Sequence, residues 1–209
     1  GLPSLELDSE DVVVRATKRG VRIDLGGIGK GYAVDLMAEL IDDWDLGPTL
    51  VHGGFSSVLA LETPADRGGW PLTLSDPGAP ARVLARLSAR QLALGASGVR
   101  KEDHIVDPRT RKPVRGRLAA WAALPRPEAP RTAAADGATE DARTPRTASA
   151  ALADALATAF MVLSTGEIER LCAGSPGLEA WLLPKPARRS DLQPALLHFG
   201  ALRRCSGRG

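Results

Sequence analysis

A glycine-rich stretch with one lysine is the segment whose residue types and spacing point most directly to chemistry. Residues 23–35 read Ile-Asp-Leu-Gly-Gly-Ile-Gly-Lys-Gly-Tyr-Ala-Val-Asp and lie between an apolar segment and an amphipathic one. Glycines at such a junction let backbone N–H groups approach an anion closely, and the N-terminus of the following helix adds partial positive charge. With the full charge of Lys30, the stretch predicts a site for a phosphorylated ligand.

The spacing matches neither of the two common phosphate-binding loops. A Walker loop needs Ser or Thr after the lysine, where Gly31 stands, and an upstream glycine, where Asp24 or Leu25 stands. The dinucleotide fingerprint needs a glycine at the position of Tyr32. A tight strand-to-helix turn with a solvated lysine is therefore the alternative interpretation of these residues.

A carboxylate and a hydroxyl four residues apart form the second candidate. Asp154 and Thr158 lie in a helix-forming segment, so both side chains would project from the same face about one turn apart. Two hard oxygens so placed suit Mg²⁺, which commonly bridges protein carboxylates and substrate phosphates. The structural alternative is an aspartate that satisfies a helix dipole and a threonine bonded to a backbone carbonyl.

His104 is the third candidate and one of only three histidines. It precedes Asp107 and Pro108, which predict a turn directly after a short strand. An imidazole with a pKa near neutrality can take a proton from a hydroxyl nucleophile. The alternative is a surface or packing residue, which is the interpretation favoured for His52 and His198.

In their order along the chain, the three motifs resemble the signatures of the FAD:protein FMN transferase family, the ApbE type. Those signatures run D-L-G-G-I-A-K-G-Y-A-V-D, H-I-I-D-P-R-T-G and A-D-A-L-A-T-A. The matching segments here are residues 24–35, 104–110 and 153–159, with smaller matches at 50–54 and 95–98. The resemblance covers residues 10–184 and leaves out mainly a loop at 125–148.

The resemblance implies transfer of FMN from FAD to a Thr or Ser hydroxyl of an acceptor protein, with release of AMP. The reaction would depend on Mg²⁺, and His104 would be the base that activates the acceptor hydroxyl. Two alternatives use the same metal site. One is a degenerate, non-catalytic module that binds Mg²⁺ and FAD, and the other is an FAD pyrophosphatase in which water gives FMN and AMP.

The resemblance also implies which residues hold the metal and the nucleotide. Asp154 and Thr158 would bind Mg²⁺ together with the backbone carbonyl of Gly27. The residues expected to line the FAD are Asp24, Lys30 and Val106. One tyrosine and three phenylalanines leave few stacking partners for an isoalloxazine ring.

Hydrophobic periodicity and turn residues predict an α+β, ApbE-like domain with a mixed or antiparallel sheet. The two main helices are expected at about 30–44 and 150–164, the first from apolar residues at helical spacing: Ala33, Met37, Leu40, Ile41 and Trp44. A hairpin of residues 12–16 and 21–25 would deliver the glycine-rich turn. Further strands are expected at 49–52, 56–62, 70–75, 81–87, 91–95, 178–183 and 192–199.

The expected organisation is a single domain over residues 1–200. A flexible loop rich in Pro, Ala and Thr is predicted at about 125–148, and a flexible tail at 201–209. The pattern corresponds to the C-terminal portion of the family, whose members carry an N-terminal part that helps to enclose the flavin. A shortened member is therefore expected to bind FAD weakly by itself.

Composition narrows the class of protein. A chain of 209 residues with 44% apolar content can bury a sizeable core, and a net charge of +2 does not favour nucleic-acid binding. The two cysteines have no metal or redox spacing, and no apolar run is long enough to span a bilayer. The compartment is unknown from these residues, and family resemblance suggests an exported, periplasmic or membrane-anchored protein.

Overall fold

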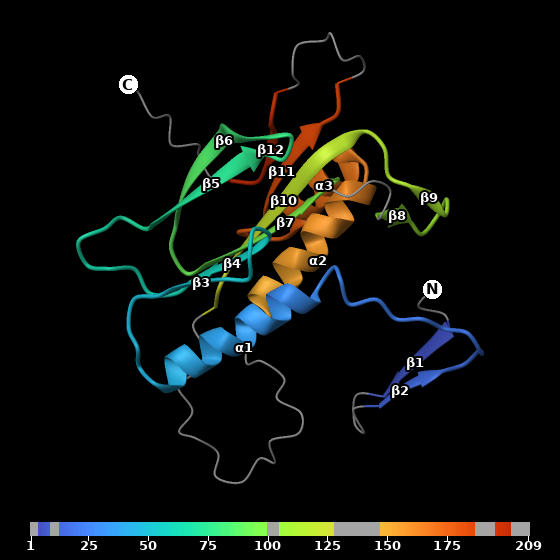
Figure 1. Cartoon of the computed structure of the whole chain (residues 1–209), viewed down its shortest axis with the longest axis horizontal. Helices are drawn as coiled ribbons and strands as arrows, with labels where there is room; N and C mark the ends of the chain where they lie inside the picture. The colour runs from blue at the N-terminus through green and yellow to red at the C-terminus, as the bar shows by residue number, and fades with distance from the viewer. Residues whose placement is uncertain (1–3, 9–12, 100–104, 128–146, 187–194, 202–209) are drawn as a thin grey trace.

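The computed structural model describes residues 4–8, 13–99, 105–127, 147–186 and 195–201. Its centre is a six-stranded antiparallel sheet in the order β12-β11-β10-β7-β4-β3 (Figure 1). The strands are β3 (Leu50–His52), β4 (Ser57–Ala60), β7 (Leu92–Gly98), β10 (Arg117–Pro125), β11 (Glu179–Pro184) and β12 (Leu197–Phe199). The predicted α+β class is confirmed, with antiparallel pairing throughout this sheet.

Helices cover one face of the sheet. Helix α2 (Ser149–Val162) packs on β7 and β10, and helix α1 (Gly29–Asp43) packs on α2 and β4. Both agree with the two predicted main helices. A third helix, α3 (Thr165–Gly174), was not among them, although Ser164 and Glu167 form a capping box at its start.

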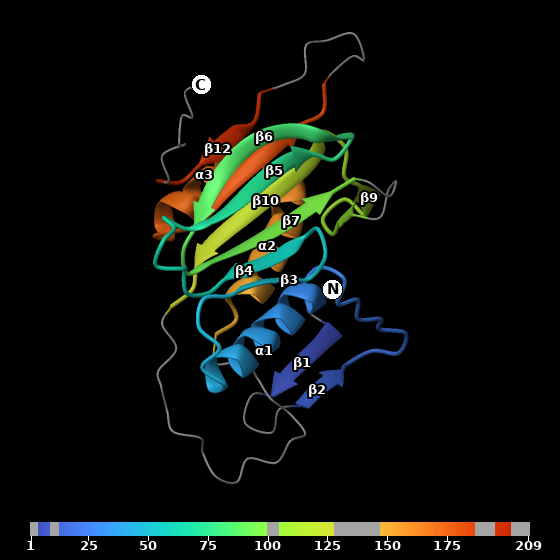
Figure 2. The same cartoon turned by 60° about the vertical axis from the view of Figure 1, so that its left-hand side comes forward.

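A long hairpin, β5 (Trp70–Asp76) and β6 (Ala79–Ala89), lies over the opposite face of the sheet (Figure 2). The two faces are separated by the alternation of side chains along each strand. In β10, Trp121 contributes to the core shared with the hairpin, whereas Ala120 and Ala122 contribute to the core shared with α2 and α3. The central strand is therefore buried on both sides.

The predicted hairpin of residues 12–16 and 21–25 is wrong. Strand β2 (Val13–Ala16) pairs instead with β1 (Leu5–Asp8), in a two-stranded sheet of its own, and residues 21–25 form no strand. Strand β1 pairs in register with β2, which leaves residues 21–25 without a strand partner before the glycine-rich turn. A second small sheet joins β8 (Val106–Asp107) to β9 (Lys112–Pro113).

The apolar stripe that predicts α1 is not the face that the helix buries. Met37, Leu40 and Trp44 are 50%, 49% and 75% exposed, whereas Val34 and Ala38 are buried. The residues that the helix buries are Gly31, Val34, Asp35, Ala38 and Glu39, and at Gly31 this face lies directly against the backbone of α2. The hydrophobic period thus predicted a helix correctly, but contact with α2 decided its orientation.

Most of the predicted 125–148 loop and 201–209 tail lies outside the described residues, so both stay predictions.

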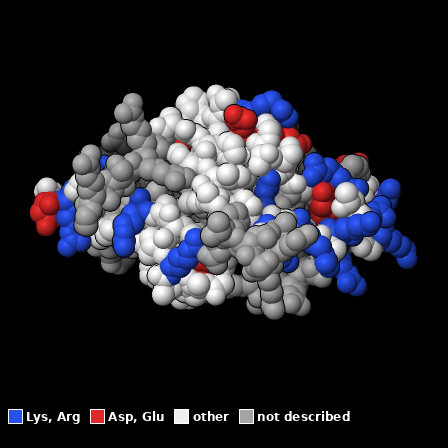
Figure 3. Space-filling view, turned by 90° about the horizontal axis from the view of Figure 1, so that it is seen from above, with Lys and Arg blue, Asp and Glu red and all other residues white. Residues whose placement is uncertain are grey.

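Basic side chains are spread over the face in Figure 3, with acidic side chains between them. No helix in the described ranges is long and apolar enough to cross a membrane.

We expect Gly31→Ala to destabilise the fold by roughly 1–3 kcal/mol, the usual cost of overpacking. A Cβ at this position would lie 2.1 Å from the backbone oxygen of Ala150. Since that atom belongs to the helix backbone, the clash can be relieved only by moving α2. Thermal unfolding measures the loss. Gly29→Ala is the control in the same helix, where a Cβ meets its nearest atom at 3.8 Å, and an equal loss in both variants would contradict the expectation.

Candidate functional site

A buried aspartate on α1 fixes the start of α2. The Asp35 carboxylate accepts hydrogen bonds from the backbone N–H groups of Ala150 (3.0 Å) and Ala151 (2.8 Å), which would otherwise be unpaired in the first turn. Burial raises the pKa of Asp35, and the two N–H donors and Arg126 oppose that shift. Because α1 begins at the glycine-rich turn, this contact sets the position of α2 relative to the turn.

The Asp154 carboxylate lies where α1, α2 and β4 meet and is 3% exposed. One oxygen, Oδ2, accepts a hydrogen bond from the backbone N–H of Gly31 at 2.9 Å. The other, Oδ1, accepts one from the hydroxyl of Ser57 at 2.6 Å. The Lys30 ammonium lies 3.7 Å from Oδ2. The structure therefore joins the first two predicted motifs directly, through a carboxylate held by donors from two elements.

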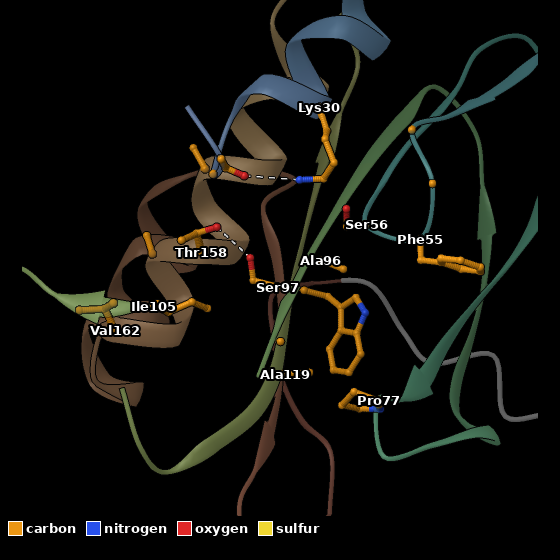
Figure 4. Close-up of a pocket in the computed structure, with 18 of the residues that line it drawn as sticks. Lys30, Phe55, Ser56, Pro77, Ala96, Ser97, Ile105, Ala119, Thr158 and Val162 are labelled. Carbon is orange, nitrogen blue, oxygen red and sulfur yellow. Dashed lines mark hydrogen bonds between the residues drawn. The ribbon is translucent and has the colours of Figure 1, made fainter. Parts of the chain in front are cut away.

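Thr158 lies one helical turn after Asp154 in α2 and is on the same side of the helix, as the four-residue spacing predicts. It faces the glycine-rich turn. Its hydroxyl is hydrogen-bonded to that of Ser97 on β7, at 2.8 Å (Figure 4). A Cβ added to Gly27 would lie 3.4 Å from the Thr158 hydroxyl oxygen, so the glycine-rich turn runs directly past this side chain. Gly27, Asp154 and Thr158 are thus brought into one neighbourhood.

Lys30 lies at the entrance to this neighbourhood. Its ammonium donates to the Gly26 carbonyl at 3.5 Å, and its side chain is about half exposed (Figure 4). Asp24 shapes the turn from the other side, because its carboxylate accepts the Gly26 N–H at 2.8 Å. A full positive charge is therefore held between a carbonyl and the buried carboxylate of Asp154.

A cavity of about 1460 Å³ opens in front of these groups. The glycine-rich turn and α2 form one wall, and β7, β10 and the β5–β6 hairpin form the other (Figure 4). Five predicted site residues line it: Asp24, Gly27, Lys30, Val106 and Thr158. Asp154 lies behind this wall, in contact with Lys30.

His104 lies outside the described residues, so its role stays a prediction. The next residues, Ile105 and Val106, line the cavity. Arg109 holds the turn that follows, by donating to the Asp107 carboxylate at 3.0 Å and to the Val162 carbonyl at the end of α2 at 3.0 Å. Hydrogen bonds from Arg109 lower the pKa of Asp107. The third motif is therefore attached to the same helix as Asp154.

Sequence reasoning missed the aromatic side chains at the cavity. The expectation of few stacking partners considered only tyrosine and phenylalanine, but Trp121 on β10 and Phe55 after β3 both line the cavity. Phe55 is 97% exposed. The position of Phe55 directly after Gly53 and Gly54 could have indicated that it lies at the site. Trp121 lies in an alanine-rich segment whose sequence does not indicate a cavity.

The chemistry of the donors fits a Mg²⁺ ion. Among the described residues no group of three or more His, Cys, Asp and Glu side chains could hold a metal ion. Mg²⁺, however, needs only one or two carboxylates when substrate phosphates and waters complete its shell. Asp154 and Thr158 offer a carboxylate and a hydroxyl beside a turn rich in backbone carbonyls. The Lys30 ammonium between Gly26 and Asp154 shows that this position favours a cation.

The chain is similar to known proteins both in sequence and in fold. A family model described as the ApbE family matches residues 1–142. The fold is also similar to that of an ApbE protein from Thermotoga maritima, with a TM-score of 0.65 and 23% identity, covering 88% of this chain and 55% of that one. No curated protein matches.

Two further solved structures have the same fold. The Pseudomonas stutzeri flavinyl transferase ApbE, in its apo form, has a TM-score of 0.67 at 18% identity. The flavin transferase ApbE from Vibrio cholerae has a TM-score of 0.66 at 18% identity. Each match covers 95% of this chain, and the chain spans 55% of the first protein and 56% of the second.

Proposed function

Because the chain belongs to the ApbE family, we propose that it transfers FMN from FAD to a Thr or Ser hydroxyl of an acceptor protein. The observation that carries the proposal is the cavity, which places a glycine-rich turn, Lys30 and Thr158 along one wall and aromatic side chains along the other. Such a site suits a ligand with a pyrophosphate and a flat ring system. The flavin transferases that share the fold support the same reaction.

The proposed reaction exchanges one phosphorus–oxygen bond for another. The acceptor hydroxyl oxygen attacks the phosphorus of the FMN half of FAD, and the bond to the AMP oxygen breaks, so that AMP leaves with the electron pair. His104 takes the hydroxyl proton. The charge of Lys30 and the N–H groups of the glycine-rich turn hold the pyrophosphate, since phosphoryl transfer depends mostly on positioning and electrostatics.

Mg²⁺ is the proposed cofactor. Asp154, Thr158 and the carbonyl of Gly27 would hold it, and when bound it would neutralise charge on the pyrophosphate. Asp24, Lys30 and Val106 would contact the FAD, as all three line the cavity. The acceptor protein would reach the site through the open side of the cavity.

One mass-spectrometric experiment tests the reaction. The chain is incubated with FAD, Mg²⁺ and a Thr-containing acceptor peptide, and the masses of the products are measured. The expected product is a peptide carrying FMN, together with AMP. Free FMN and AMP without modified peptide would instead indicate a pyrophosphatase, and intact bound FAD would indicate a binding module.

Phe55→Ala is expected to weaken FAD binding by roughly 2- to 12-fold, because an aromatic contact contributes about 0.5–1.5 kcal/mol beyond area burial. The side chain is almost fully exposed, so stability should not change. Fluorescence titration with FAD measures the affinity. Trp44→Ala is the control, since Trp44 is an exposed aromatic residue directly after α1 and does not line the cavity. Equal loss in both variants would contradict a specific contact at Phe55.

A further inference from the structure

The Asp154 carboxylate is oriented by two donors that lie far from it in the sequence. Ser57 is 97 residues away and Gly31 is 123 residues away, and each occupies one carboxylate oxygen. A carboxylate on an α-helix can otherwise rotate about its terminal torsion, which is broad and soft. Two fixed donors remove that freedom and leave Oδ2 beside Lys30 and the glycine-rich turn.

Ser57 is completely buried and lies in strand β4. Its neighbour across the ladder is Gly95 of β7. A Cβ on Gly95 would lie 2.3 Å from the carbonyl carbon of Ala153 and 2.6 Å from the backbone nitrogen of Asp154. The missing side chain at Gly95 therefore lets α2 approach the sheet closely enough for the Ser57 hydroxyl to reach the carboxylate.

We propose that Ser57 is a positioning residue, which fixes the Asp154 carboxylate in the orientation that binds a divalent cation. This inference rests on the metal assignment in the proposed function. The hydroxyl donates to Oδ1 and so directs the lone pairs of Oδ2 toward the cavity wall. Groups that orient a metal ligand in this way typically change metal affinity 10- to 100-fold when removed.

Titration of the chain with Mn²⁺, followed by electron paramagnetic resonance, tests the role without requiring turnover. Ser57→Ala is expected to weaken Mn²⁺ binding by roughly tenfold or more. Ser149→Ala is the matched control, because it removes a buried hydroxyl from the first turn of α2 that makes no hydrogen bond to Asp154. Thermal unfolding of both variants checks that they fold. Ser57→Cys keeps the shape of the side chain with a slightly larger atom and donates only weakly, so it repeats the test if the alanine variant does not fold.

Each outcome separates the positioning role from the proposed reaction. Wild-type affinity in Ser57→Ala, together with lost affinity in Asp154→Asn, would overturn the role of Ser57 and leave the metal site standing. A wild-type chain that binds no Mn²⁺ would overturn both. Weakened binding in Ser57→Ala with no FMN transfer by the wild type would support the positioning role and refute the transferase.

Discussion

Asp154→Asn is expected to lower Mg²⁺-dependent FMN transfer by roughly 10³-fold, since a bound metal ion contributes several kcal/mol of charge stabilisation. The variant should still fold. The asparagine oxygen can accept the Gly31 N–H, and the amide NH₂ can donate to the Ser57 hydroxyl, which is able to accept as well as donate. Only the negative charge is lost.

The measurement is the rate of peptide flavinylation as a function of Mg²⁺ concentration, with thermal unfolding as the check on folding. Thr158→Val should act in the same direction but more weakly, because it removes a neutral ligand. Asp42→Asn is a suitable control, since Asp42 pairs with Arg126 away from the cavity lining. Unchanged Mg²⁺ dependence in Asp154→Asn would rule out the metal assignment.

His104→Ala is expected to slow transfer by roughly 10²- to 10⁴-fold while FAD affinity stays nearly constant, if the imidazole is the general base. Only a neutral imidazole can take the proton from the hydroxyl of the acceptor protein. The wild-type rate should therefore be higher at alkaline than at acidic pH, and the variant should lose this difference.

Flavinylation rates between pH 5 and 9 and FAD titrations of both proteins measure the two effects. His52→Ala is the control, since His52 is an exposed histidine on β3 that does not line the cavity. Weaker FAD binding with normal transfer at saturation would show that His104 only shapes the pocket.

The local parts of the site were predictable because short-range geometry determines them. A four-residue spacing on a helix places Asp154 and Thr158 on one face in any fold, and the helix after the glycine-rich turn follows from its hydrophobic period. The same reasoning could not choose which face of α1 is buried. Contact with α2 at Gly31 decided that, and it left Met37, Leu40 and Trp44 exposed.

The sequence by itself thus determined the motifs, the helices that carry them and the resemblance to a family. Only the tertiary structure brought Ser57 and Gly31 to the Asp154 carboxylate, and Trp121 and Phe55 to the cavity wall. These contacts join segments about a hundred residues apart, and they depend on strand order and on close helix packing. Local spacing does not encode such contacts, because hydrophobic periodicity shows that a face is buried without showing what lies against it.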